Sequence, residues 1–522
     1  MRTKDLSKMT ILDQDVLQKA EKGRFVVDKD YNLNKSRLVV PKGMTIDLAK
    51  GSINNGTLVL DDALLENMSD GCIDAQVEGT IRNNIIYTSH FSSANNLRLV
   101  DYSDMEINYN QDETITSVIN ISGANTNGNT NTVFNGNNHN FTCYSTFFSI
   151  KNGSKNITIE NFKAIAVGQD NTFEEMVTSD GAMSGIHVLN NIVIGFKIGI
   201  SLNNDSGGAN NTVSYCTVIG NTVKNCFGSE SGQGYGIHLA NARYCTVSQN
   251  QIENCQRHSI YHAYGEHNTI SYNTIKNHCQ ELSPIRLLAA LEIGRKSNDV
   301  TVSHNTFESN NNVCLLVYSP DPGADDDGDI HGEDYPWRYG KCENIYILNN
   351  TFKRGNLTGN IGNYPFIYIG YEGATYAELE DDYLVEDVHI LNNSFEKSGG
   401  DNQKCIRINQ CKNLQVQNND FKLGLPYSSQ TNTYLVIEIP TNFISGYVSS
   451  IVIILNTFNY LSSGICPLYL MGENLSLINS SYSPNYHIVW YNNTLLNQII
   501  GGNTMYQMYN PNYPPGNNCV IL

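Results

Sequence analysis

Residues 234–265, GYGIHLANARYCTVSQNQIENCQRHSIYHAYG, decide the fold of this chain, because they contain one structural repeat and the start of the next. GYGIHLA and RHSIYHA are two versions of the same short strand. Between them lies VSQNQI, which returns along the chain as ISYNTI, VSHNTF, ILNNTF, ILNNSF, VQNNDF and IILNTF. Self-similarity of this kind is typical of a solenoid.

Each repeat carries an asparagine at the same turn position. The spacing fits a coil of roughly 22 residues with insertions of variable length in its loops. An Asn side chain tolerates left-handed backbone and has both a donor and an acceptor, so stacked Asn side chains can satisfy buried turn groups. We therefore predict an asparagine ladder at Asn221, Asn250, Asn273, Asn305, Asn350, Asn393, Asn419 and Asn456.

Each coil divides into three strands. One precedes the Asn and one follows it. The third comes after a variable loop, as GIHLA, SIYHA, ALEIG, CLLVY, FIYIG, CIRIN and VIEIP, in which apolar residues alternate with others. This division resembles the pectate-lyase-like superfamily of right-handed parallel β-helix proteins over about residues 100–460.

The expected fold class is therefore all-β, a right-handed parallel β-helix with a cap at each end. We predict an N-terminal lead-in and β cap over 1–98, a catalytic β-helix over 99–460, and a C-terminal cap or assembly segment over 461–522. The first 22 residues are expected to form a short helix or a disordered lead-in. The protein would be a monomer or a homotrimer.

The charge and composition of the chain limit the kinds of partner and location that it can have. The chain has 522 residues and a formal net charge of −18, which argues against nucleic acid, because a polyphosphate needs a basic surface. No apolar run is long enough to cross a membrane as a helix. The first residues are too polar for a secretory signal, so we expect an extracellular or periplasmic protein if a signal was removed, and otherwise a virion-associated one.

The thirteen cysteines follow the repeat instead of forming a disulfide framework. Cys216 and Cys245 share one position in the coil, and Cys226, Cys255 and Cys279 share another. Aligned cysteines form a column of small buried side chains. We predict reduced, structural thiols and no metal quartet.

The outward residues of the third strands form the candidate site. They follow the inward residues Ile237, Ile260, Leu291, Leu315, Ile367, Ile406 and Ile437, on the face where the resemblance implies a substrate groove. Coils lie about 5 Å apart, so neighbours in the column are close together. In stacking order the column is Ser201, His238, Tyr261, Glu292, Leu316, Tyr368, Arg407 and Glu438.

Cleavage of a uronic-acid polysaccharide by β-elimination needs a base, an acid, and a cation that holds the carboxylate. We predict His238 as the base and Tyr261 as the acid, with proton return through Tyr261 as the alternative. Arg257 or Arg295 would be the carboxylate clamp. Glu292 completes the catalytic set, and no cofactor is required. The residues predicted to bind substrate are Arg295, Arg286, His258, Tyr368, Arg407 and Trp337.

These residues also have structural interpretations. An outward His is commonly an ordinary surface residue, and exposed tyrosines are frequent in a chain with 31 of them. Arg257 and Arg295 could be ion-pair partners of Glu281 and Glu292. His262 falls in the inward phase, so we expect a core histidine with satisfied hydrogen bonds.

Two acidic, aromatic insertions interrupt the repeat at 319–340 and 371–384, and we expect both to flank the groove. The first contains Trp337 and a run of carboxylates that could bind Ca²⁺. Its spacing does not fit a twelve-residue calcium loop, and a solvated acidic loop is the alternative. The candidate calcium ligands are Asp325, Asp327 and Asp329.

Three hypotheses follow from the sequence. The first is a polysaccharide lyase acting on an acidic, uronic-acid-containing polysaccharide such as a glycosaminoglycan-like chain. The second is a phage tailspike-type depolymerase or glycoside hydrolase, which needs a carboxylate pair. Glu281 is the residue that could partner Glu292 in such a pair. The third is a non-catalytic carbohydrate-binding β-helix.

Overall fold

The computed structural model describes residues 9–20, 23–97, 99–121, 130–167, 175–204, 212–228, 233–277, 289–308, 312–319, 340–354, 364–370, 385–397, 404–409, 411–423, 434–439, 448–454, 456–460, 465–470, 488–491, 494–496 and 519–521. The chain divides into two compact units, Met1–Val223 and Lys224–Leu522. Among the described residues, no helix has the length and apolar character needed to cross a membrane.

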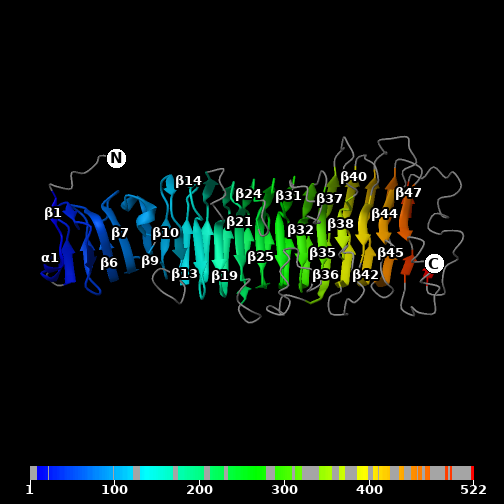
Figure 1. Ribbon diagram of the computed structural model, residues 1–522, viewed down its shortest axis with the longest axis horizontal. Coiled ribbons are helices and arrows are strands. Elements are labelled where there is room, and N and C mark those ends of the chain that lie inside the picture. Colours follow the sequence, from blue (N-terminus) through cyan, green and yellow to red (C-terminus); the bar gives the residue numbers. More distant parts are fainter. Residues whose placement is uncertain are drawn as a thin grey trace. The chain divides into compact units, whose positions relative to one another are not determined.

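The first unit begins with a small sheet of parallel strands (blue in Figure 1). Strand β6 is central to it and pairs with β3, β4, β5 and β7, while β1, β2 and β9 lie further out. A short helix, α1 (Gln14–Gln18), is capped by the Asp13 side chain, which accepts a hydrogen bond from the N–H of Val16. The strands are β1 (Thr10–Ile11), β2 (Arg24–Val26), β3 (Tyr31–Asn32), β4 (Arg37–Val39), β5 (Thr45–Asp47), β6 (Ile53–Glu66), β7 (Ile73–Ile81) and β9 (Leu99–Asp101).

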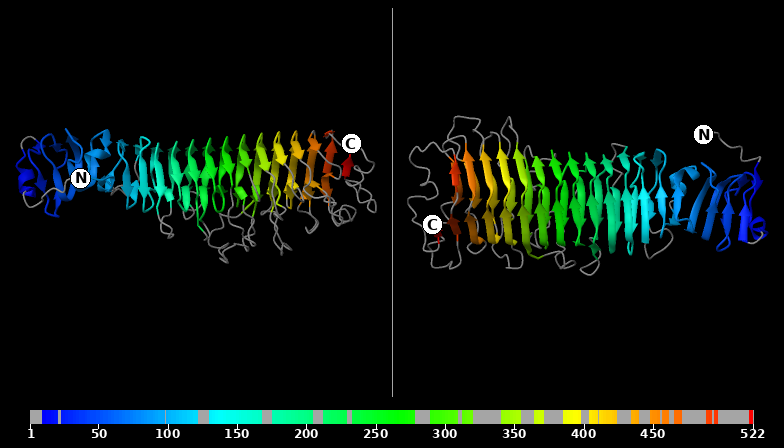
Figure 2. Two further views of the ribbon diagram at one scale, coloured as in Figure 1. Left: turned by 90° about the horizontal axis from the view of Figure 1, so that it is seen from above. Right: turned by 180° about the vertical axis from the view of Figure 1, so that it is seen from behind.

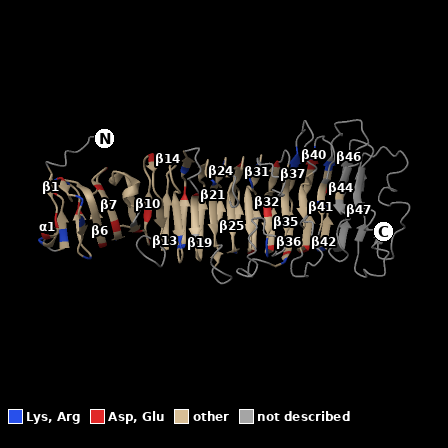
Figure 3. Cartoon of the chain, in the orientation of Figure 1, with Lys and Arg blue, Asp and Glu red and all other residues tan. Residues whose placement is uncertain are grey.

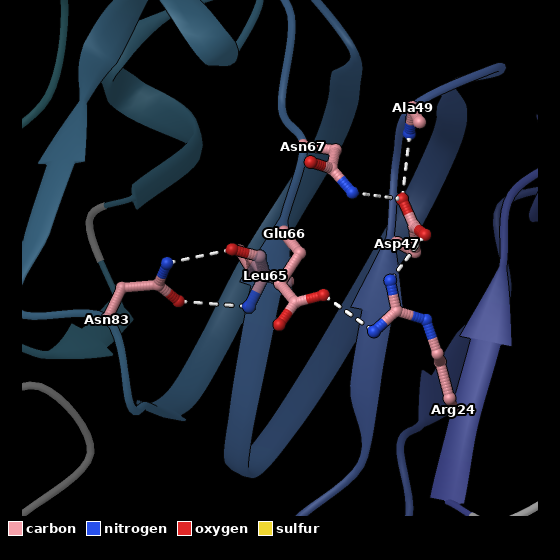
Figure 4. Close-up of polar contacts among 7 residues, drawn as sticks. All are labelled: Arg24, Asp47, Ala49, Leu65, Glu66, Asn67 and Asn83. Atoms are coloured by element: carbon pink, nitrogen blue, oxygen red, sulfur yellow. Dashed lines mark hydrogen bonds and ion pairs between the residues drawn. The ribbon is translucent and has the colours of Figure 1, made fainter.

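Polar side chains join successive strands of this sheet. Arg24 on β2 contacts Asp47 on β5 at 2.6 Å and Glu66 on β6 at 2.7 Å. The side chain of Asn83 forms two hydrogen bonds with the backbone of Leu65, accepting one from its N–H and donating one to its carbonyl oxygen. Figure 4 shows these contacts. They support the prediction that an atypical β segment precedes the coils; the boundaries at 98 and 460 stay predictions.

The rest of the first unit is a stack of coils with three parallel sheets, preceded by two 3₁₀ turns, Thr88–His90 and Ala94–Leu97. The first sheet contains β8 (Ile85–Tyr87), β10 (Glu106–Asn108), β13 (Thr130–Asn135), β16 (Lys155–Glu160), β19 (Met183–Leu189), β22 (Val213–Ser214) and β23 (Thr217–Ile219). The second contains β11 (Glu113–Ile115), β14 (Asn140–Cys143), β17 (Lys163–Ala166) and β20 (Ile192–Ile194), and β24 (Thr222–Lys224) lies at the boundary of the units. The third contains β12 (Ile119–Ile121), β15 (Phe148–Lys151), β18 (Glu175–Asp180) and β21 (Ile198–Asn203).

The second unit has the same three-sheet arrangement, with strands stacked coil upon coil (green to red in Figure 2). The first sheet contains β26 (Ala242–Arg243), β27 (Thr246–Ser248), β30 (Glu266–Ser271), β33 (Asn298–Ser303), β36 (Cys342–Leu348), β39 (Val385–Leu391), β42 (Cys411–Gln417), β45 (Val448–Ile454), β48 (Ile488–Tyr491) and β50 (Cys519–Ile521). The second contains β28 (Gln251–Glu253), β31 (Thr274–Lys276), β34 (Thr306–Glu308), β37 (Thr351–Arg354), β40 (Ser394–Lys397), β43 (Asp420–Leu423), β46 (Thr457–Tyr460) and β49 (Thr494–Leu496). The third contains β25 (Tyr235–Ala240), β29 (Ile260–Ala263), β32 (Ala289–Gly294), β35 (Val313–Tyr318), β38 (Ile367–Ile369), β41 (Lys404–Ile408), β44 (Tyr434–Ile439) and β47 (Ile465–Leu470).

The predicted asparagine ladder is present. In the second unit the Oδ1 atom of each ladder Asn from Asn273 to Asn456 accepts hydrogen bonds from the backbone N–H and the side-chain amide of the Asn one coil before it, and Asn250 is the first donor. In the first unit Asn191 donates to Asn221 in the same way, so the ladder starts one coil earlier than the sequence pattern indicated. Each side chain thereby satisfies turn groups that water cannot reach.

The ladder predicts a stability effect. Replacing Asn273 with Ala should lower the free energy of unfolding by about 1–3 kcal/mol, because it leaves buried polar groups of Asn250, Asn305 and Val247 without their partner. Thr274→Ala, at the half-buried next residue, is the control and should stay within about 0.5 kcal/mol of the unmodified chain. Urea unfolding curves measure both, and equal midpoints for the two variants would contradict the role given to Asn273.

The outer face of the second sheet is charged and partly exposed, with alternating sign from coil to coil. Lys276 contacts Glu308 at 2.9 Å, and Lys422 contacts Glu396 at 3.6 Å, in pairs whose side chains are 40–48% exposed. Elsewhere the strands of the second unit carry few charges (tan in Figure 3). The paired column is Glu253, Lys276, Glu308, Lys353, Glu396 and Lys422.

The cysteines behave as structural residues. The ten cysteines whose side chains the structure describes are all buried thiols. This confirms, for these ten, the prediction of reduced thiols; Cys279 lies outside the described residues.

Candidate functional site

The outward column of the third sheet in the second unit has the predicted register. The pairings run from His238 to Tyr261, Glu292, Leu316, Tyr368, Arg407 and Glu438, one per coil. The inward column from Ile237 to Ile437 is equally regular. Ser201 belongs to β21 of the first unit.

The column is largely buried. The exposed fraction is 7% for His238 and 4% for Glu292, and Leu316 and Tyr368 are buried too. Tyr261 is half-buried. The side chains predicted to share an outer wall therefore do share one face, and Tyr261 is the accessible group among the first three.

Four rings meet at the start of this face. Tyr235 and Tyr261 stack with centroids 5.1 Å apart and planes 7° from parallel. The His238 ring stands edge-on against Tyr261 at 5.2 Å, and the His258 ring tilts against the same phenol ring at 5.6 Å. Aromatic rings prefer such offset and edge-on arrangements, which fixes the orientation of the Tyr261 side chain.

A buried ion pair lies beside these rings. His258 Nε2 is 3.0 Å from Glu292 Oε2, and both side chains are about 5% exposed or less. His258 Nδ1 is 2.9 Å from the carbonyl oxygen of Ala289, so both ring nitrogens are engaged within the protein. His258 thus contacts Glu292, and its predicted role in substrate binding stays a prediction.

The pKa of Glu292 lies below its ordinary value. Burial acts to raise it, but the charge and hydrogen bond of His258, the charge of Arg295 and a hydrogen bond from Tyr318 outweigh that effect. A carboxylate held ionised in this way cannot easily donate a proton. Glu292 therefore fits an electrostatic or positioning role better than that of a general acid.

The two candidate arginines differ in access. Arg257 is 5% exposed, with its guanidinium carbon 5.7 Å from the centre of the Tyr235 ring. Arg295 is half-buried, lies 5.8 Å from the centre of the Tyr264 ring, and donates a hydrogen bond to the Tyr264 hydroxyl. The sequence left the choice between them open, and accessibility favours Arg295.

The pKa of the Tyr261 phenol is raised well above its ordinary value. Burial is the main cause, and the charge of Arg295 acts in the opposite direction. The phenol is therefore protonated at neutral pH, which is the state an acid needs.

A glycine permits this packing. A Cβ atom at Gly294 would lie 3.0 Å from Cε1 of Tyr318 and 3.3 Å from Oε1 of Glu292. Any larger residue would push the phenol ring or the carboxylate aside. Gly294 thus keeps Glu292 and Tyr318 together on the same face.

His262 is a core histidine, as predicted. It is fully buried and accepts a hydrogen bond at Nε2 from the Asn268 amide, while Nδ1 lies 3.1 Å from Ser297 Oγ. Ser297 in turn donates to the carbonyl oxygen of Gly294, and so ties this network to the turn beside the candidate site. Burial lowers the pKa of His262 to about 4.

This low pKa predicts acid sensitivity. The ordinary His pKa is 6.5, so as pH falls the unfolded chain takes up the proton before the folded chain does. The contribution of neutral His262 to the free energy of unfolding is complete above pH 6.5 and is lost as the pH falls from 6.5 to about 4. The loss reaches about 2 kcal/mol by about pH 5. Urea unfolding at neutral pH and at about pH 5 measures the loss, which His262→Gln should reduce. Equal losses in both proteins would contradict this assignment.

Two predicted binding residues lie three and two coils beyond Glu292. Arg407 places its guanidinium carbon 5.5 Å from the centre of the Tyr368 ring, and its Nε donates to Asn409 Oδ1. Tyr368 packs with Leu316, Val313 and Ala289 in an apolar cluster. These residues share the face of the site, and the apolar cluster meets its polar groups at Ala289, whose carbonyl oxygen lies 2.9 Å from His258 Nδ1.

Several predicted residues lie outside the described part of the chain. They are Arg286, Trp337, Glu281 and the candidate calcium ligands Asp325, Asp327 and Asp329. Within the described ranges, no group of three or more His, Cys, Asp and Glu residues is arranged to hold a metal ion.

Sequence reasoning missed three tyrosines of the site, Tyr235, Tyr264 and Tyr318. Tyr235 begins β25, Tyr318 ends β35, and Tyr264 comes directly after β29. None of these positions belongs to the outward column, so the column did not indicate them. Tyr264 follows β29 at the position where Arg295 follows β32. A search for equal positions after each strand would have found that pair.

Residues 165–352 match the protein family described as "Right handed beta helix region". Together with the register of the coils, this match confirms the predicted all-β, right-handed parallel β-helix. No curated protein matches the sequence.

Similar solved structures include the catalytic domain of an α-1,3-glucanase in complex with nigerose, with 14% identity, a TM-score of 0.43, and coverage of 74% of this chain and 63% of that one. The chain thus spans less than two thirds of that domain. The Dettilon tailspike protein shows 12% identity and a TM-score of 0.36, with 73% and 66% covered. A periplasmic alginate epimerase shows 12% identity and a TM-score of 0.34, with 93% and 84% covered.

Proposed function

For a chain that contains a right-handed parallel β-helix, we propose the function of a polysaccharide lyase that cleaves an acidic, uronic-acid-containing polysaccharide by β-elimination. The observation that carries the proposal is the setting of Tyr261. The residue is half-buried and its ring is held by contacts with Tyr235 and His238. Its phenol is protonated and close enough to Arg295 to be influenced by its charge.

In the proposed reaction a base removes the proton from the carbon beside the uronate carboxylate. The electron pair of that C–H bond forms a double bond to the neighbouring carbon, and the glycosidic C–O bond there breaks. The leaving oxygen takes a proton from the acid. We assign the base to His238 and the acid to Tyr261, with proton return through Tyr261 as the alternative. Glu292, ionised and paired with His258, supports these groups and the cation beside them.

A glycoside hydrolase of the tailspike type is the second candidate. It needs two carboxyl groups across the scissile bond, one of them protonated. Among the described residues of this cluster Glu292 is the carboxylate, and its pKa is lowered. This favours the lyase, because elimination needs no carboxylate pair.

Incubation with several uronic-acid polysaccharides tests the proposal. A lyase creates an unsaturated uronate, which absorbs in the near ultraviolet, with one new reducing end for each bond broken. New reducing ends without that absorbance would identify a hydrolase, and binding without either signal would identify a carbohydrate-binding protein.

A further inference from the structure

The turn that follows the third strand is left-handed at β32. Arg295 and Lys296 both adopt left-handed conformations, with φ of 51° and 53°. Left-handed residues recur at the turns of this solenoid, and Asn241, at the equivalent position after β25, has φ of 51°. Tyr264 occupies the same turn one coil earlier, with φ of 53°, and its N–H donates to the carbonyl oxygen of Arg295 at 2.9 Å. The left-handed turn therefore sets the two side chains one above the other.

Because of this placement, the side chains of Arg295 and Tyr264 contact each other. Arg295 Nη1 donates to the Tyr264 hydroxyl, and the guanidinium lies over the same ring. The ring contact and the hydrogen bond together restrict a long side chain that would otherwise sample many rotamers. Tyr264 itself is buried and packs with Ala240, Ala263 and Tyr261.

The charge of Arg295 reaches the reacting groups. It acts to lower the pKa of both the Tyr261 phenol and the Glu292 carboxyl. Arg295 and Tyr261 are both half-buried, whereas Arg257 is almost completely buried. An anion that approaches this face from outside would thus meet Arg295 before Arg257.

We propose that Arg295 is the specificity-determining residue of the site, binding the carboxylate of an acidic sugar, and that Tyr264 is the positioning residue that aims it. This inference rests on the proposed function and names the cation, which the sequence left open. A guanidinium suits the task because its planar fork can donate two parallel hydrogen bonds to a carboxylate.

The test measures equilibrium binding of the full chain to oligosaccharides of galacturonate, of alginate and of a glycosaminoglycan, each beside its carboxyl-reduced form. Arg295→Asn removes the cation but keeps a residue that tolerates left-handed backbone. Lys296→Asn is the matched control, because it removes the same charge from the adjacent left-handed position, where the side chain is exposed.

Arg295→Asn should weaken binding of the preferred acidic oligosaccharide by about 10- to 100-fold, as loss of charged hydrogen bonds does, and leave binding of its reduced form unchanged. Lys296→Asn should change neither. Tyr264→Phe should weaken binding by about 3- to 10-fold in the unmodified chain, and should have no further effect once Arg295 is replaced. A merely structural Tyr264 would instead weaken binding in both backgrounds.

Other results would overturn the inference. They are equal binding of acidic and reduced sugars by the unmodified chain, no binding of any of the three acidic sugars, or equal losses for Arg295→Asn and Lys296→Asn. Tight, Arg295-dependent binding without cleavage would uphold the inference and overturn only the lyase.

Discussion

Replacing Tyr261 with Phe is expected to lower kcat on the preferred acidic polysaccharide by about 100-fold or more, with the fold retained. The change removes a single oxygen, so the ring contacts with Tyr235, His238 and His258 can persist. What is lost is the proton donor to the leaving oxygen. Initial rates of ultraviolet absorbance change measure the effect, and the melting temperature shows that the fold is intact.

Two companion variants sharpen this result. Tyr272→Phe removes the same oxygen from a tyrosine that is 57% exposed, and it should leave kcat unchanged. His238→Ala should also lower kcat by about 100-fold if His238 is the base. If His238→Ala is fully active and Tyr261→Phe is inactive, the Tyr261 phenol carries out both proton transfers. Normal rates for both variants would refute the site.

Replacing Glu292 with Ala is expected to lower the free energy of unfolding by about 3–5 kcal/mol. Removal of one partner from a buried ion pair leaves the other buried without compensation, and here His258 would lose its contact at Nε2. Glu292→Gln keeps an oxygen that can accept from His258 and should cost less. Urea unfolding at neutral pH measures each variant.

The matched control is Glu308→Ala. Glu308 contacts Lys276 at 2.9 Å, nearly the distance of the buried pair, but its side chain is 41% exposed. Exposed pairs of this kind contribute about 0–1 kcal/mol. Equal losses at positions 292 and 308 would contradict the role assigned to burial. The double variant His258→Leu with Glu292→Leu should be less unstable than either single change, because neither ionisable partner is left buried without the other.

The coil register could be predicted from sequence. The repeat carries the Asn marker and the inward Ile or Leu of each third strand, so the pairing of His238 with Tyr261 and of Tyr261 with Glu292 follows from counting. In a stacked coil a slip of one residue would turn every apolar side chain outward, which makes such counting reliable. His262 in the core follows from the same phase.

The partners within the site could not be predicted in this way. His258 lies before its strand and Arg295 after its own, where the period says nothing about side-chain direction. Their contacts depend on the tyrosines that surround them, on the absence of a Cβ atom at Gly294, and on the left-handed turn at Arg295. The sequence pattern therefore left the choice between Arg257 and Arg295 open, and it gave no indication that His258 contacts Glu292.

The sequence by itself determined that this chain is a parallel β-helix and which residues share each column, because both depend only on a period repeated many times. The tertiary structure alone decided that His258 contacts Glu292, that Arg257 is buried, and that Arg295 and Tyr261 are only partly buried. The physical reason is that burial and side-chain pairing arise where turns and neighbouring coils converge, and the local repeat contains no information about those contacts.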